Sequence, residues 1–174
     1  MATTYEAIAT VTVGSGGAAN IEFTSIPATY TDLLLKTSLR TNKADTEEWV
    51  SLEFNGSGGT AYSMRMLYGN GTDALSLSTS SAADIQFSSM AVSTNSTSNT
   101  FSNAEYYIPN YAGSNNKSIS VDGVSEANAT KAFTNLTAGL WANSAAITSI
   151  KIFPDTTGSF VQYSTATLYG IKNS

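Results

Sequence analysis

The stretch that decides the fold is IEFTSIPATYTDLLLKTSLR, residues 21–40. Apolar and polar side chains alternate near both of its ends, and the second part places Leu33, Leu35 and Leu39 on one face. Pro27 lies between the two parts, and a proline belongs at a bend because its ring fixes φ and it has no N–H for a sheet ladder. The stretch therefore predicts a strand, a corner and a second strand with one buried face, which is typical of one layer of an antiparallel fold.

The same alternation recurs along the rest of the chain. It places Val50, Leu52 and Phe54 on one face, and Tyr62 and Met64 on the face of another strand. Roughly eight to ten such segments follow one another at the 8–12-residue spacing of a sandwich or barrel. We predict an all-β fold, an antiparallel two-sheet sandwich of jelly-roll type, in one domain over residues 1–174.

Residues 73–103 have the weakest pattern in the chain. We expect one short strand at residues 85–88 and a mobile Ser/Thr-rich loop at residues 93–100, because that loop offers no apolar side chain to bury. Asp45 and Glu48 are spaced to cap a single helical turn. These expectations depend on local signals alone.

Asp122-Gly123 is a further local signal. It follows an alternating segment that begins at Lys117 and precedes another that begins at Val124. An Asp-Gly pair between two apolar runs favours a tight β-hairpin. The sequence therefore predicts a turn at this dipeptide.

Composition excludes several classes of function. The 174 residues include no histidine and no cysteine, which removes the Ser-His-Asp and Cys-His catalytic arrangements and the usual zinc ligands. Charged residues make up only 12% of the chain, the net charge is −5, and the eight basic residues are scattered. We therefore predict no nucleic-acid partner. No apolar run approaches the length of a membrane span, so we predict no membrane partner.

Two carboxylates are the best candidates for acid chemistry. Glu53 and Glu105 both lie on predicted strands, and a glycosidase needs two acids facing each other across a groove at about 5–9 Å. Trp49 shares the outward face of Glu53 and would suit a sugar platform. The alternative is that both acids are solvated on a sheet surface, and we favour it, so no catalytic residue is predicted.

Other polar motifs give no cofactor or metal site. Asp73, Asp122 and Asp155 have oxygen ligands of the kind calcium prefers, but turn aspartates are ordinary and none of the three lies in an EF-hand loop. The glycine-rich segments 14–17 and 56–59 lack the Lys-Ser or Lys-Thr of a phosphate-binding loop. We predict no cofactor and no metal.

Aromatic residues are the remaining candidates for contact with a partner. Interface or glycan contacts are predicted at Tyr30, Trp49, Tyr106, Tyr107 and Tyr111. Tyrosine combines a large apolar area with one hydroxyl group, which suits both protein interfaces and sugar sites. Packing in the core is the alternative for each of them.

Two segments carry a family resemblance. With residues 21–40 near its start and STATLYGIKNS at its end, the chain resembles small jelly-roll virion proteins of tailed bacteriophages. These are the head decoration or cement proteins and the related head domains of tail fibres. The resemblance covers both ends of the chain, and the middle only through its Gly, Ser, Thr and Asn loops. It carries no catalytic motif.

The resemblance implies a structural role on the virion. It implies a decoration protein that binds the major capsid protein on the outer capsid surface and stabilises the shell, and that associates with itself as a homo-oligomer, most commonly a trimer. A tail-fibre module that binds a receptor or a host surface glycan is the alternative. The first predicted strand begins at about Tyr5, without a preceding shaft, so we expect the capsid role.

Overall fold

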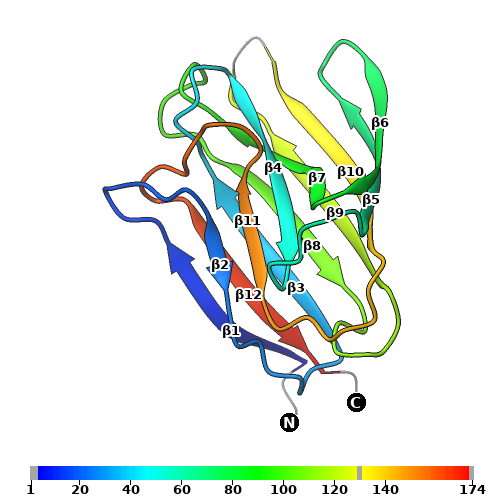
Figure 1. Ribbon diagram of the computed structural model, residues 1–174. Coiled ribbons are helices and arrows are strands. Elements are labelled where there is room, and N and C mark those ends of the chain that lie inside the picture. The colour runs from blue at the N-terminus through cyan, green and yellow to red at the C-terminus, as the bar shows by residue number, and fades with distance from the viewer. Residues whose placement is uncertain (1–3, 129–130, 173–174) are drawn as a thin grey trace.

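The computed structural model describes residues 4–128 and 131–172, and these residues form twelve β-strands and no helix (Figure 1). No helix in this described part could therefore cross a membrane. The strands are β1 (Tyr5–Thr12), β2 (Ile21–Phe23), β3 (Asp32–Leu39), β4 (Glu47–Phe54), β5 (Tyr62–Gly69), β6 (Ala74–Ala82), β7 (Ile85–Val92), β8 (Ser102–Ile108), β9 (Lys117–Ser125), β10 (Phe133–Trp141), β11 (Ile150–Pro154) and β12 (Thr165–Ile171).

The strands form two antiparallel sheets that pack face to face. The larger sheet has eight strands in the order β1-β12-β3-β8-β9-β10-β5-β6, and the smaller has four in the order β2-β11-β4-β7. In Figure 1 the smaller sheet lies in front of the larger one. The predicted antiparallel two-sheet sandwich is confirmed, with twelve strands in place of eight to ten. The jelly-roll pattern and the single domain over residues 1–174, whose ends lie outside the described residues, stay predictions.

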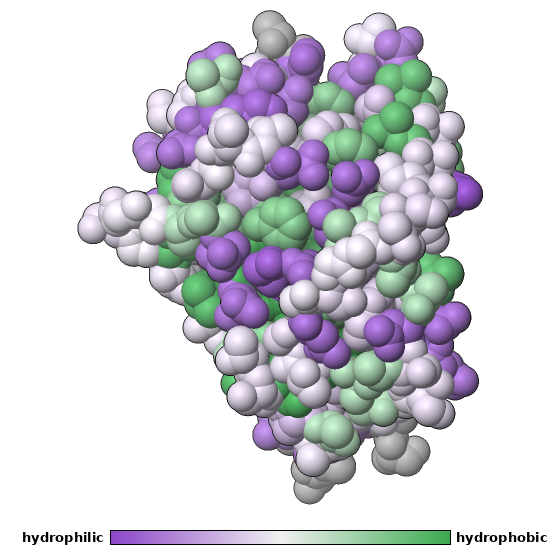
Figure 2. Space-filling view, viewed as in Figure 1, coloured by the Kyte–Doolittle hydropathy of each residue, from purple (hydrophilic) through white to green (hydrophobic). Residues whose placement is uncertain are grey.

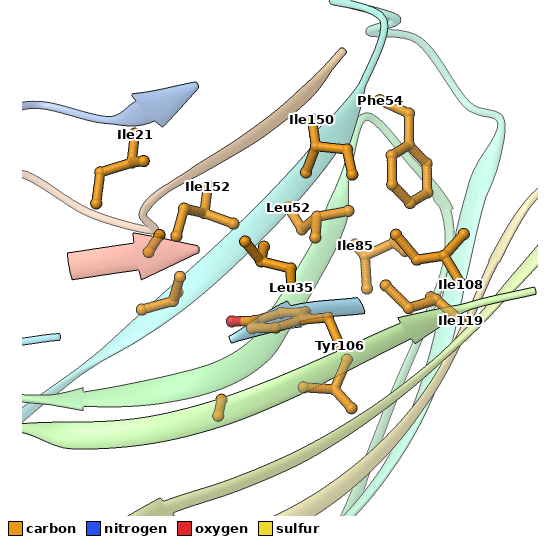
Figure 3. Packing of buried hydrophobic residues seen from close by; sticks show 14 of the residues in the cluster. Ile21, Leu35, Leu52, Phe54, Ile85, Tyr106, Ile108, Ile119, Ile150 and Ile152 are labelled. Atoms are coloured by element: carbon orange, nitrogen blue, oxygen red, sulfur yellow. The ribbon is translucent and has the colours of Figure 1, made fainter. Parts of the chain in front are cut away.

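The hydrophobic core lies between the two sheets, where the predicted apolar faces meet. Leu35 from β3 and Leu52 from β4 are fully buried, and Figure 3 shows them close to Tyr106 of β8. Burial of apolar side chains from both layers removes their surface from water, which is the main favourable term in folding. The faces predicted for the three leucines of β3, for β4 and for the first half of β5 are therefore correct.

The corner at Pro27 carries the chain from one sheet to the other. β2 belongs to the smaller sheet, whereas β3 lies inside the larger sheet between β12 and β8. Tyr111 is buried against this corner, where its hydroxyl group donates a hydrogen bond to the carbonyl oxygen of Pro27. At the predicted corner the chain therefore passes from the smaller sheet to the larger one.

The predicted hairpin turn at Asp122-Gly123 is wrong, because β9 runs straight through it. Gly123 lies opposite Asn135 of β10, and a Cβ atom at Gly123 would lie 2.6 Å from the Oδ1 atom of Asn135. The glycine makes room for a buried amide side chain and supplies no turn. The chain reverses later, between β9 and β10.

Residues 73–103 are more ordered than the sequence suggests. β6 was not predicted, and β7 is longer than the expected strand at residues 85–88. The loop expected to be mobile is fastened by Arg40, whose Nη1 atom donates to the carbonyl oxygens of Thr97 and Thr100 at 2.9 Å each. Polar contacts replace the apolar burial that this loop lacks.

The helical turn proposed for Asp45 and Glu48 is also wrong. Glu48 is the second residue of β4 and is buried, and its Oε1 atom accepts hydrogen bonds from the backbone N–H and hydroxyl of Thr156. Asp45 accepts a hydrogen bond from the backbone N–H of Thr46 at 2.8 Å. The two carboxylates therefore accept hydrogen bonds from different donors, and neither caps a helix.

Candidate interaction surface

The outer face of the eight-stranded sheet is the candidate interaction surface. Its alternate residues point away from the core, and the strand register aligns them in rows across the sheet. One row runs from β3 to β5 through Lys36, Glu105, Asp122, Leu136 and Leu67. The row begins with charged residues and ends with two leucines.

The leucine end of this face is exposed and apolar. Leu67 of β5 and Leu136 of β10 are direct cross-strand partners, and their exposed fractions are 65% and 58%. Leu140, four residues farther along β10 on the same face, is also exposed. We call these three residues the leucine patch. Large apolar side chains gathered on an open surface mark a binding site more often than single exposed ones do.

Arg65 borders the leucine patch without covering it. Its Nη1 atom donates hydrogen bonds to the carbonyl oxygens of Met64, at 2.7 Å, and Thr79, at 3.2 Å, so the guanidinium lies against the backbone of β5 and β6. A shallow groove of about 550 Å³ runs beside it, lined by residues that include Leu67 and Leu136. The charge of Arg65 is thus directed away from the two most exposed leucines.

Tyrosines occupy the opposite side of the same face. Tyr169 of β12 and Tyr107 of β8 flank Leu34 of β3 in one cross-strand row, and Tyr5 of β1 lies at the sheet edge with an exposed fraction of 53%. A groove of about 430 Å³ is lined by Tyr5, Leu34, Tyr169 and the ion pair of Lys36 and Glu105. Tyr5, Tyr107 and Tyr169 form what we call the tyrosine patch.

The outer face of the smaller sheet has a different character. Lys151 of β11 lies between Glu22 of β2 and Glu53 of β4 and forms an ion pair with Glu53. Figure 2, which views the molecule from this side, shows hydrophilic residues over these strands. The apolar contact surface therefore belongs to the larger sheet.

The two acids considered for glycoside hydrolysis are not brought together. Glu53 points outward from the smaller sheet, since its neighbours Leu52 and Phe54 are buried, and Glu105 points outward from the larger sheet, paired with Lys36 at 2.6 Å. Two sheets packed face to face lie about 10 Å apart, and these side chains point in opposite directions from them. No groove is shared by the two carboxylates.

The five aromatic candidates have different environments. Tyr106 and Tyr111 are fully buried, so the predicted surface contact is wrong for both, and the Tyr106 hydroxyl lies 2.5 Å from that of Ser89. Tyr107 points the opposite way from Tyr106 and is 40% exposed. Its hydroxyl donates to Asp32 at 2.9 Å, and this hydrogen bond raises the pKa of Tyr107. Only Tyr107 of the three lies on the outer face.

Trp49 and Tyr30 are half-buried. Trp49 packs against Phe87 at 5.3 Å and Tyr68 at 5.8 Å between ring centroids, so it joins a cluster of aromatic rings and does not form an open platform. Tyr30 covers Gly170, where a Cβ atom would lie 2.3 Å from the ring, and Lys172 lies over the ring at 5.2 Å. Both side chains stabilise local packing.

The aspartates considered for calcium lie on separate parts of the fold. Asp73 lies between β5 and β6, Asp122 on β9, and Asp155 directly after β11. Across residues 4–128 and 131–172, no group of three or more Asp and Glu side chains is arranged to hold a metal ion. The oxygen ligands needed for calcium are therefore not assembled from these three residues.

Asp84 has an unusual carboxyl group. Burial first, and the nearby charge of Asp155 second, raise its pKa to about 6, while Asp155 itself accepts a hydrogen bond from Ser51 at 2.8 Å. Within the described residues, Asp84 Oδ1 has no hydrogen-bond partner. The charged form of Asp84 is thus disfavoured in the folded protein.

Asp84→Asn is expected to stabilise the protein by about 1 kcal/mol at pH 7.5, less than the full equivalent of the shift because water screens this half-exposed group. The raised pKa means that the folded state binds the proton more tightly than the unfolded state. The contribution of Asp84 to stability therefore falls as pH rises from about 4 to about 6. Urea unfolding of both proteins at pH 4 and 7.5 checks this, and a variant less stable than wild type at pH 7.5 contradicts it.

The leucine patch was not identified from the sequence, although one signal was present. Leu67 lies on the face of β5 that also carries Ser63 and Arg65, opposite the buried face of Tyr62, Met64 and Met66. An apolar residue on an otherwise polar face is a departure from the pattern of a half-buried strand. That departure was the available signal.

Comparison with known proteins adds no assignment to this surface. The chain matches no protein-family model. Its sequence shows no significant similarity to any of the curated proteins.

Proposed function

We propose that this chain is a bacteriophage capsid decoration protein that binds the major capsid protein on the outer surface of the shell. The observation that carries the proposal is the leucine patch on the open face of the eight-stranded sheet, with Leu67 and Leu136 more than half exposed. The resemblance of residues 21–40 and of the chain's last residues to decoration proteins of tailed phages supports the same role. Its location would be the virion, and its chemistry would be adhesion, without catalysis.

The proposed mechanism is a linkage between binding and shell stability. A sheet face can lie against a protein surface with little reorganisation of its backbone, and a stable contact buries about 800 Å² on each partner. If the face binds the expanded shell and not the unexpanded or unfolded one, mass action raises the stability of the expanded shell. The apolar contact supplies the free energy of this binding.

The test uses expanded shells of the phage that carries this gene. Wild-type protein is expected to co-sediment with them and to raise their melting temperature. Leu67→Asp/Leu136→Asp is expected to weaken binding at least 100-fold, because each charge would be buried unpaired at the contact. Thr24→Asp/Thr60→Asp, which adds the same charge at loop positions outside the strands, is the matched control. Wild-type protein that does not bind these shells refutes the proposal.

A second candidate function rests on the tyrosine patch. The exposed ring of Tyr5 and the half-buried ring of Tyr169, beside the ion pair of Lys36 and Glu105, provide apolar faces and polar groups, the combination that binds sugars. This arrangement favours a receptor- or glycan-binding module of a tail fibre. Saturable binding to host cells or polysaccharide, lost in Tyr5→Ala/Tyr169→Ala and retained in Leu67→Asp/Leu136→Asp, would support it over the capsid role.

A further inference from the structure

β6 is an open edge of the eight-stranded sheet. In the described part of the chain it is last in the strand order and pairs with β5 alone. The backbone N–H of Asn70 donates to the carbonyl oxygen of Asp73 at 3.2 Å, and hydrogen-bonded pairs alternate from there along an antiparallel hairpin. Ala74, Ser76 and Ser78 therefore direct their backbone N–H and C=O groups away from β5.

Residues 74–78, the first part of β6, have none of the features that protect a sheet edge. ALSLSTSSA contains no charged residue and no proline. At the other edge of the same sheet, β1 carries Glu6, paired with Lys172 at 3.2 Å, and an irregularity between Ala7 and Ala9. Charges, bulges and proline are the usual means of preventing pairing between edges. β6 has neither a charge nor a proline, and its own irregularity is confined to its end, after Thr79, so residues 74–78 leave a regular edge that can accept another strand.

Two leucines on β6 are exposed on the core side of the sheet. Leu75 and Leu77 share the face of Met66 and Tyr68, but the smaller sheet does not cover them, and their exposed fractions are 42% and 36%. Figure 2 shows hydrophobic residues at the upper right of the molecule, where β6 lies in Figure 1. The open backbone edge and an apolar strip thus coincide.

We propose that a second copy of this chain pairs with β6, antiparallel and about a two-fold axis at Ser76. Each Ser76 then lies opposite its counterpart, and Leu75 of each copy packs against Leu77 of the other. An axis at Ser78 would require pairing through the irregular end of β6, where Ser81 has φ 55°. An axis at Ala74 would run the strands into the loop at residues 70–73.

The charge and symmetry of β6 favour a second copy of this chain as its pairing partner. The whole chain has a net charge of −5, which opposes self-association in general, and a contact along β6 adds no like-charge pair because this segment is uncharged. The two-fold arrangement is self-complementary, since backbone donors meet acceptors and leucine meets leucine. A trimer, by contrast, cannot place all of its subunits in two-fold strand pairs.

The pairing would join two sheets into one of sixteen strands. Because the axis is perpendicular to the sheet, the leucine patches of both copies would face the same side. A docking partner would then meet two patches at once, which increases the apparent affinity. This inference does not depend on the proposed function, because it concerns self-association alone.

Cysteine cross-linking tests both the contact and its register. The chain contains no cysteine, so Ser76→Cys introduces a single thiol. Counterparts in a hydrogen-bonded pair have Cα atoms about 5.5 Å apart, within disulfide range. Counterparts at position 78 would be roughly 14 Å apart, four residues of rise along the strand. Under mild oxidation Ser76→Cys is expected to give a covalent dimer and Ser78→Cys none; equal cross-linking of the two, or none, overturns the proposal.

Native mass measurement of the full chain supplies an independent test. Wild type is expected to be dimeric at micromolar concentration, and Ser76→Pro monomeric, since proline removes an outward N–H without breaking a bond to β5. Leu77→Lys, which places a charge at the contact, is expected to give the same result and covers the case in which the proline variant fails to fold. A wild-type monomer, or a trimer unaffected by Leu77→Lys, overturns the proposal.

Discussion

Trp141→Ala is expected to lower the free energy of unfolding by about 4 kcal/mol, the range for a large aromatic residue removed from a core. Trp141 ends β10 and is only 1% exposed. Its ring lies 5.6 Å from that of Phe54 and 6.1 Å from that of Tyr62, which it stacks upon. Alanine would leave a cavity between β4, β5 and β10 that these rings cannot fill by moving. Chemical denaturation followed by far-UV circular dichroism measures the loss.

Leu140→Ala is the matched control, because Leu140 precedes Trp141 on the same strand and points to the opposite face. It is expected to change the free energy of unfolding by no more than about 0.5 kcal/mol. The same substitution removes part of the leucine patch and is expected to weaken shell binding. An equal loss of stability in the two variants would contradict the assignment of inner and outer faces on β10.

The core faces could be predicted from the sequence because, in a two-layer sheet fold, the apolar side of an alternating strand must face the other sheet. Leu33 and Leu35 in β3, and Val50 and Leu52 in β4, are buried as their alternation requires. The pattern fails in β6, whose residues are exposed on nearly the whole strand. Only Leu75 and Leu77 alternate with serines in β6, and neither is buried, so the alternation was too short to identify the strand.

The alternation rule also applies to the aromatic candidates of β8. Tyr106 and Tyr107 are consecutive residues of β8 and must therefore point to opposite faces. Once one is in the core, the other lies on the outer face, as their burial shows. The sequence alone could thus have limited this pair to one surface residue.

The leucine patch depends on information that the sequence does not contain. Leu67 and Leu136 meet because β5 and β10 are neighbours in a particular register. Both facts are set by packing over the entire sheet, and a shift of the register by one residue would move one leucine to the other face. The candidate surface therefore became visible only when the strand order was known.

Gly123→Val is expected to lower the free energy of unfolding by about 3 kcal/mol. Gly123 lies inside β9 opposite Asn135, whose Nδ2 atom donates to Ser88 O at 3.3 Å and to Thr137 Oγ1 at 3.2 Å. A Cβ atom at Gly123 would displace the Asn135 amide and leave buried polar groups unpaired, which adds about 1–3 kcal/mol to an overpacking cost of similar size. Urea unfolding at pH 7.5 measures the change.

Ser120→Val provides the same valine on the outward face of β9, where Ser120 is exposed, and it is expected to be neutral or slightly stabilising because β-branched residues suit strands. The pair of variants distinguishes two accounts of Asp122-Gly123. If the dipeptide were an exposed turn, as its chemistry alone suggests, valine at position 123 would disturb only the turn and Asn135 would keep its hydrogen bonds. A Gly123→Val protein as stable as Ser120→Val would contradict the prediction. It would show that the buried Asn135 amide does not need the space left by the absence of a side chain at position 123.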